Sequence, residues 1–304
     1  MPDTARRSSK LVIQTLGLAL IVAFSFAVGC RSVNNENQQS GFRVVNDDLG
    51  REVSIPVSPN RVISLAPSVT EMVFAAGAGD RLIGVTSYCN FPADAEKIAK
   101  VGDTQTPNIE RIVALKPDVI FVSTASQLEA FTDTLASQNI AVYVTDVRDL
   151  RGVSRTLRAF GTIFGTSETA DLLADNMEKK AEAAGQQANG NGKPKVFIQI
   201  SKEPLFTVGT ESFLTEIVFR AGGISLTKDI SGGYPKISKE AALAMDPDVI
   251  ILSDSEDNRE PNDVFTNSKA VKNGRIIRVN ADILSRPGPR LVDALELIAK
   301  VLHK

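Results

Sequence analysis

The chain has 304 residues, and its 43% hydrophobic and 23% charged content is that of a globular protein with room for about two domains. Its formal net charge of −2 gives no sign of the strongly basic surface that nucleic acid requires, so no nucleic-acid partner is expected.

The first thirty residues carry an export signal. A basic start, "MPDTARRSSK", is followed by the apolar run "LVIQTLGLALIVAFSFAVG", which ends at Cys30. The ending "AVGC" resembles the bacterial lipoprotein signal, which implies that residues 1–29 are a signal peptide and that Cys30 carries the lipid. The polar residues 30–41 then form a tether. The alternative is an uncleaved anchor, because about 20 apolar residues can cross a bilayer.

The cysteine and histidine content argues against metal and disulfide chemistry. The chain has only two cysteines, Cys30 and Cys89, and one histidine, His303. If Cys30 carries lipid, Cys89 has no partner for a disulfide. We expect Cys89 to be a buried structural thiol, although a role as a metal ligand is the alternative, and we predict neither a metal nor a cofactor.

The first elements after the tether are a hairpin, a strand and a helix. The pattern "FRVVNDDLGREVSI" predicts a β-hairpin that turns at residues 48–50. The apolar run 61–66 predicts a buried strand, and "PSVTEMVFAAGAG" predicts a helix. Ser68 and Glu71 have the spacing of a capping box, which accounts for Glu71 without a function.

Strands and helices then alternate, which predicts parallel βαβ layers. We expect an N-terminal lobe over residues 42–165 and a connecting helix with its linker over 166–192. The segment "GQQANGNGKPK" is the best candidate boundary. A second lobe is expected over 193–304, beginning with the strand 195–200.

An internal repeat supports this division into two lobes. The segment "ERIVALKPDVIFVS", which starts at Glu110, agrees with "EAALAMDPDVIILS", which starts at Glu240, at seven of 14 positions. A second pair, "TEMVFAAG" from Thr70 and "TEIVFRAG" from Thr215, agrees at six of eight positions. We therefore predict a duplicated α/β lobe with a ligand cleft between the copies.

The strand-end loops hold aromatic and basic side chains suited to a large, partly apolar ligand. Tyr88, Phe206 and Tyr234 are candidate cleft aromatics, and packing within a loop or core is the alternative for each. Arg286 and Arg290 flank a Pro-Gly-Pro sequence; they either meet polar groups of a ligand or only charge the loop. The chain has no G-x-S-x-G, P-loop or C-x-x-C motif, so we do not expect an enzyme.

The segments "LAPSVTEMVFAAG", "SYCNFP", "NIERIVALKPD", "PLFTVG" and "GPR" resemble the helical-backbone (class III) substrate-binding proteins of ABC importers for vitamin B12, ferric siderophores and haem. The likeness covers residues 42–304 and is greatest to the vitamin B12-binding members. It implies an α/β fold of two similar lobes with parallel sheets, joined by a long connecting helix. One residue differs: Thr104 stands where those proteins place a tryptophan.

The resemblance also implies a function and partners. It predicts a monomeric, lipid-anchored, extracytoplasmic protein that captures a corrinoid such as cobalamin and delivers it to an ABC permease and its ATPase. A ferric siderophore or haem is the alternative ligand. Tyr88, Phe206 and Tyr234 fall where the family places aromatics around the corrin.

Glu110 and Glu240 fall where the family places two glutamates that pair with permease arginines. Asn108 and Ser238 are natural N-caps, which puts both glutamates at the second helical position. There a carboxylate is favoured by the helix dipole alone, and this is the alternative to docking.

Overall fold

The structure is a computed structural model and describes residues 41–124, 129–187 and 192–303. The predicted signal peptide, the lipidation site Cys30 and most of the predicted tether lie outside the described residues. From Gly41 onward the chain is one unit. In the three described ranges, no helix has the length and apolar character needed to cross a membrane.

The predicted hairpin is confirmed. β1 (Phe42–Asn46) pairs antiparallel with β2 (Glu52–Pro56). The buried Asp47 carboxylate holds the turn, because it accepts hydrogen bonds from the backbone N–H groups of Leu49 and Arg51 and forms an ion pair with the Arg51 guanidinium. A hydrogen bond from the Asp48 N–H to the Val144 carbonyl fixes the hairpin to the first sheet.

Two four-stranded parallel sheets confirm the predicted fold class. The first sheet has the order β4 (Leu82–Val85), β3 (Val62–Ser64), β5 (Val119–Ser123), β6 (Ala141–Thr145). The second has the order β8 (Ile224–Ser225), β7 (Lys195–Gln199), β9 (Val249–Asp254), β10 (Ile276–Asn280). When the strands of each sheet are taken in chain order, the two orders are the same. The internal repeat is therefore a repeat of topology as well as of sequence.

Each sheet is covered on both faces, which is why its strands are continuous apolar runs. Side chains alternate between the faces along a strand. On β5, Val119 and Phe121 join one buried cluster and Ile120 and Val122 another. On β9, residues 249–252 alternate in the same way. One face of each sheet contributes to a single core cluster that is common to both halves of the chain.

Helices of different lengths connect and cover the strands. The described helices are α2 (Pro67–Ala75), α3 (Ile109–Ala114), α4 (Glu129–Ala136), α5 (Leu150–Phe164), α6 (Ser167–Gln187), α7 (Phe213–Arg220), α8 (Lys239–Leu243), α9 (Lys269–Lys272), α10 (Ala281–Ser285) and α11 (Leu291–Leu302), with short 3₁₀ turns at Gly79–Arg81, Ala93–Lys97 and Asp263–Phe265.

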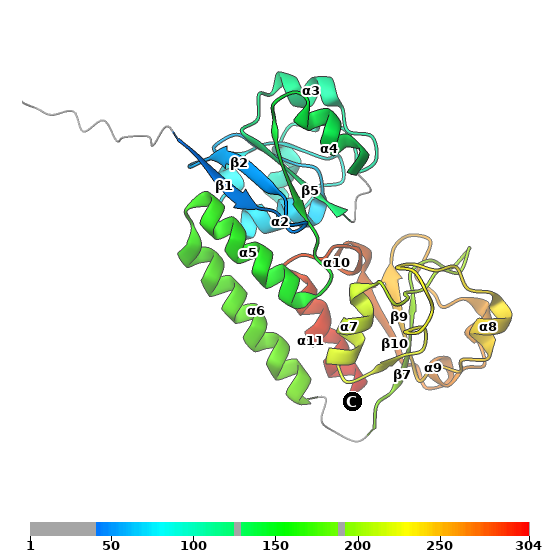
Figure 1. Ribbon diagram of the computed structural model, residues 1–304. Coiled ribbons are helices and arrows are strands. Elements are labelled where there is room, and N and C mark those ends of the chain that lie inside the picture. The colour runs from blue at the N-terminus through cyan, green and yellow to red at the C-terminus, as the bar shows by residue number, and fades with distance from the viewer. Residues whose placement is uncertain (1–40, 125–128, 188–191, 304) are drawn as a thin grey trace, which may run out of the picture. The chain divides into compact units, whose positions relative to one another are not determined.

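The long helices α5 and α6 pack along each other, and α6 also contacts α2, α7 and α11 (Figure 1). Phe160 of α5, Met177 of α6 and Leu295 of α11 are all buried in the common core cluster. Because these helices contribute to the same cluster as both sheets, the connection between the two halves is a packed layer.

The repeat also conserves a strained turn. Lys116 and Asp246 stand at matching positions, each before a proline, and have φ angles of 47° and 40°. The next aspartate in each copy accepts a backbone N–H at the start of the first strand of its sheet. Asp118 accepts from Arg61, just before β3, and Asp248 accepts from Lys195, the first residue of β7. Each copy therefore has a left-handed residue in this turn and, two residues later, an aspartate that binds the first strand of its sheet or the residue before it.

Two sequence-based predictions about helix ends are wrong. Ser68 does not cap α2, whose N-cap is Ala66 and has no side-chain cap hydrogen bond. The reason is that α2 already begins at Pro67, which favours the first helical position, so Ser68 is the second residue of the helix. Glu71, the other member of the predicted capping box, binds other partners that are described below. The predicted boundary segment also begins too early, because Gly185 is still within α6. Burial of Ala181 and Ala184 in the common core favours this extra helical turn despite the glycine.

Candidate functional site

A large pocket lies where the loops that follow two strands of the first sheet meet the α7 region of the second half. Its volume is about 1180 Å³. Thr124 follows β5 and residues 146–148 follow β6, so the carboxyl ends of parallel strands form one wall, as in other open α/β sheets. Residues 210–213 and Tyr234 form part of the opposite wall.

Gly209 allows two loops of this wall to approach each other. Its N–H donates to the Gly233 carbonyl at 3.1 Å, and the Thr210 N–H donates to the Ile230 carbonyl at 2.8 Å. A Cβ atom at position 209 would lie within 2.3 Å of the Gly232 carbonyl oxygen and 2.4 Å of the Ile230 carbonyl oxygen. Glycine is therefore required for Tyr234 to be held beside residues 210–213.

The pocket lining mixes apolar, hydroxyl and charged groups. On the first-sheet side, the Asp146 carboxylate accepts a hydrogen bond from the Thr124 hydroxyl at 2.7 Å and forms an ion pair with Arg148 at 2.7 Å. At another part of the lining, the Lys193 ammonium lies 5.4 Å from the centre of the Phe219 ring. Such a lining suits a large amphipathic ligand, for which apolar walls and a few polar groups are needed.

The three aromatic side chains predicted to line the cleft lie in different parts of the structure. Tyr234 lines the pocket and is 44% exposed, and burial raises the pKa of its phenol. Phe206 is half-buried. Its segment pairs with the segment that holds Tyr234, because the Thr207 N–H donates to the Pro235 carbonyl at 3.1 Å. Tyr88 is 58% exposed after β4. Of the five predicted ligand-binding residues, Tyr234 alone belongs to the described residues that line this pocket.

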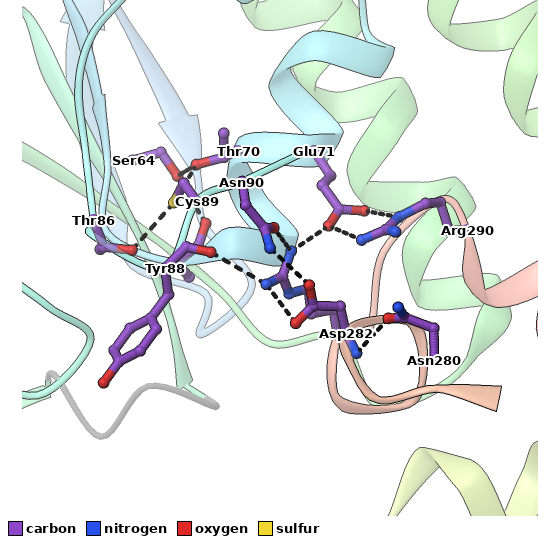
Figure 2. Close-up of polar contacts among 12 residues, drawn as sticks. Ser64, Thr70, Glu71, Thr86, Tyr88, Cys89, Asn90, Asn280, Asp282 and Arg290 are labelled. Atoms are coloured by element: carbon purple, nitrogen blue, oxygen red, sulfur yellow. Dashed lines mark hydrogen bonds and ion pairs between the residues drawn. The ribbon is translucent and has the colours of Figure 1, made fainter. Parts of the chain in front are cut away.

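The predicted arginines form a buried ion-pair cluster with Glu71 (Figure 2). Arg286 Nη1 lies 3.0 Å from Glu71 Oε1. Arg290 Nε donates to Glu71 Oε2 at 2.8 Å and its Nη2 to Oε1 at 2.6 Å. The Glu71 side chain is 2% exposed. The guanidinium groups are thus directed at protein atoms, and contact of either arginine with a ligand stays a prediction.

Cys89 is buried, as expected for a structural thiol, and is a free cysteine. Its sulfur lies 3.2 Å from the Thr70 hydroxyl and 3.1 Å from the Thr86 hydroxyl. Among the described residues, no group of three or more His, Cys, Asp or Glu side chains is arranged to hold a metal ion.

Glu110 and Glu240 are both exposed at the second position of their helices, as predicted. The Asn108 side chain accepts the Arg111 N–H, and the Ser238 side chain accepts the Ala241 N–H, so both predicted N-caps are confirmed. The pKa of Glu240 is lowered, chiefly by its own backbone N–H and then by Ser238. Their role in docking stays a prediction.

Sequence reasoning missed Glu71, which it treated as part of a capping box. A signal was nevertheless present in the repeat, where Glu71 matches Glu216. A capping box needs a serine three residues before the glutamate, as Ser68 is to Glu71. In the second copy the N-cap Ser212 stands four residues before Glu216, so the matching glutamate needs another explanation. Both glutamates prove to bind groups far away in the chain.

Comparison with known proteins agrees with the fold. A family model described as "Periplasmic binding protein" matches residues 62–283. The chain therefore belongs to the periplasmic binding protein family. Its class is that of binding proteins with two parallel α/β lobes, and its relatives are substrate-binding proteins of ABC transporters and vitamin B12-binding proteins.

Among the relatives, a vitamin B12-binding protein of Pectobacterium carotovorum is 32% identical over 80% of this chain and 88% of its own. The uncharacterized ABC transporter substrate-binding lipoprotein YvrC of Bacillus subtilis is 28% identical over 94% of this chain and 95% of its own. These alignments extend over nearly the whole of each relative, so the likeness is not confined to one lobe.

Solved structures show the same fold. The vitamin B12-binding protein BtuF of Vibrio cholerae has a TM-score of 0.71 and 28% identity, covering 80% of this chain and 96% of its own. A haem-binding protein of Pseudomonas aeruginosa has a TM-score of 0.72 at 22% identity, covering 81% of this chain and 93% of its own, which is a likeness of fold alone.

Proposed function

We propose that this protein is the substrate-binding component of an ABC importer and that its ligand is a corrinoid such as cobalamin. The observation that carries the proposal is the size of the pocket. At about 1180 Å³ it exceeds the range of about 300–1,000 Å³ that is usual for small-molecule sites. Relatives named as vitamin B12-binding proteins, at up to 32% identity, support this ligand class.

In this proposal the aromatic side chains contact the ligand directly. Tyr234 lies in the pocket wall, Phe206 lies on the segment paired with it, and Tyr88 offers an exposed ring on a loop after β4. Rings of this kind give a large contact area with little loss of rotamer freedom, and tyrosine adds a hydroxyl for polar groups of the ligand. Polar groups at Thr210 and Ser212 would meet amide side chains of a corrinoid.

A second ligand class is favoured by one observation, the partial exposure of two phenols. Tyr88 is 58% and Tyr234 44% exposed, and a tyrosine oxygen can bind the iron of haem. A ferric siderophore or haem is therefore the alternative ligand. In the haem case, a tyrosine ligand would give the purified complex a Soret band that Tyr88→Phe or Tyr234→Phe removes.

The test of ligand class is a panel of thermal unfolding measurements on the purified full-length protein. Cyanocobalamin, haemin and a ferric hydroxamate siderophore are each added at about 100 times the micromolar protein concentration. We expect cyanocobalamin to raise the midpoint by about 5 °C or more, because a ligand that binds only the folded state stabilises it. A rise with haemin or the siderophore alone would replace the corrinoid by that ligand.

The proposed delivery of the ligand to a membrane permease rests on two further assignments. Glu110 and Glu240 are exposed at matching positions of the repeat, so they offer one carboxylate on each lobe to a permease. Cys30 would carry a lipid that holds the protein at the outer face of the membrane, in agreement with the lipoprotein named among its relatives. Labelling with a fatty-acid probe should mark the wild-type protein and not Cys30→Ser.

A further inference from the structure

Glu71 carries a buried charge that is paired with residues distant in the sequence. Its partners, Arg286 and Arg290, are 215 and 219 residues away in sequence. A buried carboxylate is costly unless it is paired and hydrogen-bonded, and here both oxygens accept guanidinium N–H groups. The cluster therefore ties α2 to the segment between α10 and α11.

Arg286 extends this contact to the loop after β4, residues 88–91, here called the 88–91 loop. Its Nη1 donates to the Asn90 side-chain oxygen at 2.7 Å and its Nη2 to the Tyr88 carbonyl at 3.2 Å. Asp282 closes a ring, since it accepts from the Asn90 amide at 2.8 Å and pairs with Arg286 at 2.8 Å. The Tyr88 backbone is thus held by a guanidinium that Glu71 orients (Figure 2).

Arg290 holds the same loop through a different contact. Its guanidinium carbon lies 4.1 Å from the centre of the Phe91 ring, within the range of a cation–π interaction. The hydrogen bonds that Arg290 donates to Glu71 raise the pKa of Arg290, so the charge needed for this contact is secured. Glu71 therefore orients both of the arginines that contact the 88–91 loop.

Cys89 anchors the 88–91 loop through its buried side chain and its carbonyl. Its side chain is 1% exposed and faces the hydroxyls of Thr70 and Thr86, while the Lys100 ammonium donates to its carbonyl at 3.0 Å. The Tyr88 ring points away from the ion-pair cluster (Figure 2). A loop held on both sides that leaves one large ring free has the arrangement of a pre-organised ligand contact.

We propose that Glu71, acting through Arg286 and Arg290, is a positioning residue that sets the 88–91 loop so that Tyr88 presents its ring to the ligand. The proposal rests on the proposed function for the identity of the ligand. It assigns Arg286 and Arg290 to support of the loop and does not require either to contact the ligand.

The first test needs no ligand. In the full-length chain with Cys30→Ser, Cys89 is the only thiol. We expect Glu71→Gln to increase the rate of Cys89 modification by Ellman's reagent at least tenfold, because release of the loop uncovers the thiol. Glu178→Gln is the matched control, since it removes a carboxylate that pairs with Arg158 on α5 and is remote in sequence from the loop. Equal rates in the wild type and Glu71→Gln would overturn the proposal.

Asn90→Ala gives the same test without leaving a buried charge. It removes the side-chain contact between the loop and Arg286 and leaves Glu71 paired. If Glu71→Gln does not fold, the Asn90→Ala rate decides the question, with at least a threefold increase expected and an unchanged rate against the proposal.

The second test asks whether the effect reaches the ligand through Tyr88. Cyanocobalamin affinity is measured for Asn90→Ala and Glu71→Gln, each with Tyr88 intact and with Tyr88→Ala. We expect about a tenfold loss with Tyr88 present and less than a twofold loss in its absence. Equal losses in both backgrounds would show a merely structural role. If the wild type binds no cyanocobalamin, the proposed ligand fails, and the thiol rates still decide the role of Glu71 in holding the loop.

Discussion

Glu71 and Glu216 occupy matching positions of the internal repeat, and each binds a segment that follows the last strand of the other sheet. Glu71 on α2 binds Arg286 and Arg290, which follow β10. Glu216 on α7 accepts the backbone N–H of Leu150 at 3.2 Å, at the start of α5, which follows β6. The two halves of the chain are therefore joined by a reciprocal pair of contacts, of which one is a buried ion-pair cluster and the other a single hydrogen bond.

This asymmetry predicts different costs for removing the two glutamates. Glu71→Ala removes the carboxylate that pairs with Arg290 and one of the two that pair with Arg286, and it should lower the free energy of unfolding by about 3–5 kcal/mol. Glu216→Ala should cost about 0.5–1.5 kcal/mol, because its side chain is 26% exposed and gives up one backbone hydrogen bond and a partly exposed ion pair with Arg220. Urea denaturation of both variants measures the difference, and equal costs would contradict the assignment of the stronger contact to Glu71.

Gly209 predicts a link between backbone packing and ligand binding. In Gly209→Ala the added Cβ meets the carbonyl oxygens of residues 230 and 232, so the two loops must separate and Tyr234 must move. We expect a loss of ligand affinity of about tenfold or more with a folded protein. Gly185→Ala on α6 is the control, because a Cβ there has no heavy atom closer than 3.8 Å and Gly185 does not line the pocket. Equal affinities for the two variants would mean that Tyr234 is not held by this close approach.

The raised pKa of Tyr234 predicts an alkaline limit to binding. Burial holds this pKa above the value of an unfolded chain, so the stability that it contributes is complete below about pH 10 and is lost as the pH rises through the folded-state pKa. A ligand that covers the phenol removes more water and raises the pKa further, so affinity should fall over the same interval. Burial and the Asp48 and Asp47 carboxylates raise the pKa of Tyr143 well above its usual range. Tyr143 therefore does not ionise in the pH interval in which Tyr234 is followed.

Tyrosinate absorbance, followed during alkaline titration with and without ligand, measures this shift. We expect the ligand to delay tyrosine ionisation, and we expect Tyr234→Phe to remove the part of the delay that Tyr234 contributes. Superimposable curves for the free and liganded wild type would exclude contact between ligand and the Tyr234 phenol.

Docking at the two repeat glutamates predicts a separation of binding from transport. The double variant Glu110→Ala, Glu240→Ala should bind ligand as the wild type does and lose uptake in cells that carry the cognate permease. A second double variant, Glu168→Ala with Glu256→Ala, removes the same charge from other exposed positions and should transport normally. Normal uptake by the first variant would leave helix-dipole stabilisation as the sufficient explanation for both glutamates.

The sequence predicted the fold because its signals are local and repeated. Buried strands such as residues 119–123 are short apolar runs, and the duplication of the Glu110 segment at Glu240 indicated two equal lobes before any contact was known. The N-caps Asn108 and Ser238 were also predictable, since the cap side chain and the backbone N–H that donates to it lie three residues apart.

The ion-pair cluster was not predictable in the same way. A local rule, the capping box, offered a complete explanation for Glu71 within four residues, whereas its true partners are more than 200 residues distant. Arg286 and Arg290 were recognised as important and given a ligand as partner, because a sequence alone does not show which charges meet. The matching glutamate in the second copy was the one available clue.

The central claim, that the chain is a corrinoid-binding protein, is tested most directly by calorimetric titration of the purified full-length protein with cyanocobalamin. The account predicts saturable binding of one ligand per chain with a dissociation constant in the micromolar range or below, weakened by Tyr234→Ala. Absence of heat and of any change in the corrin absorbance at micromolar ligand would contradict it.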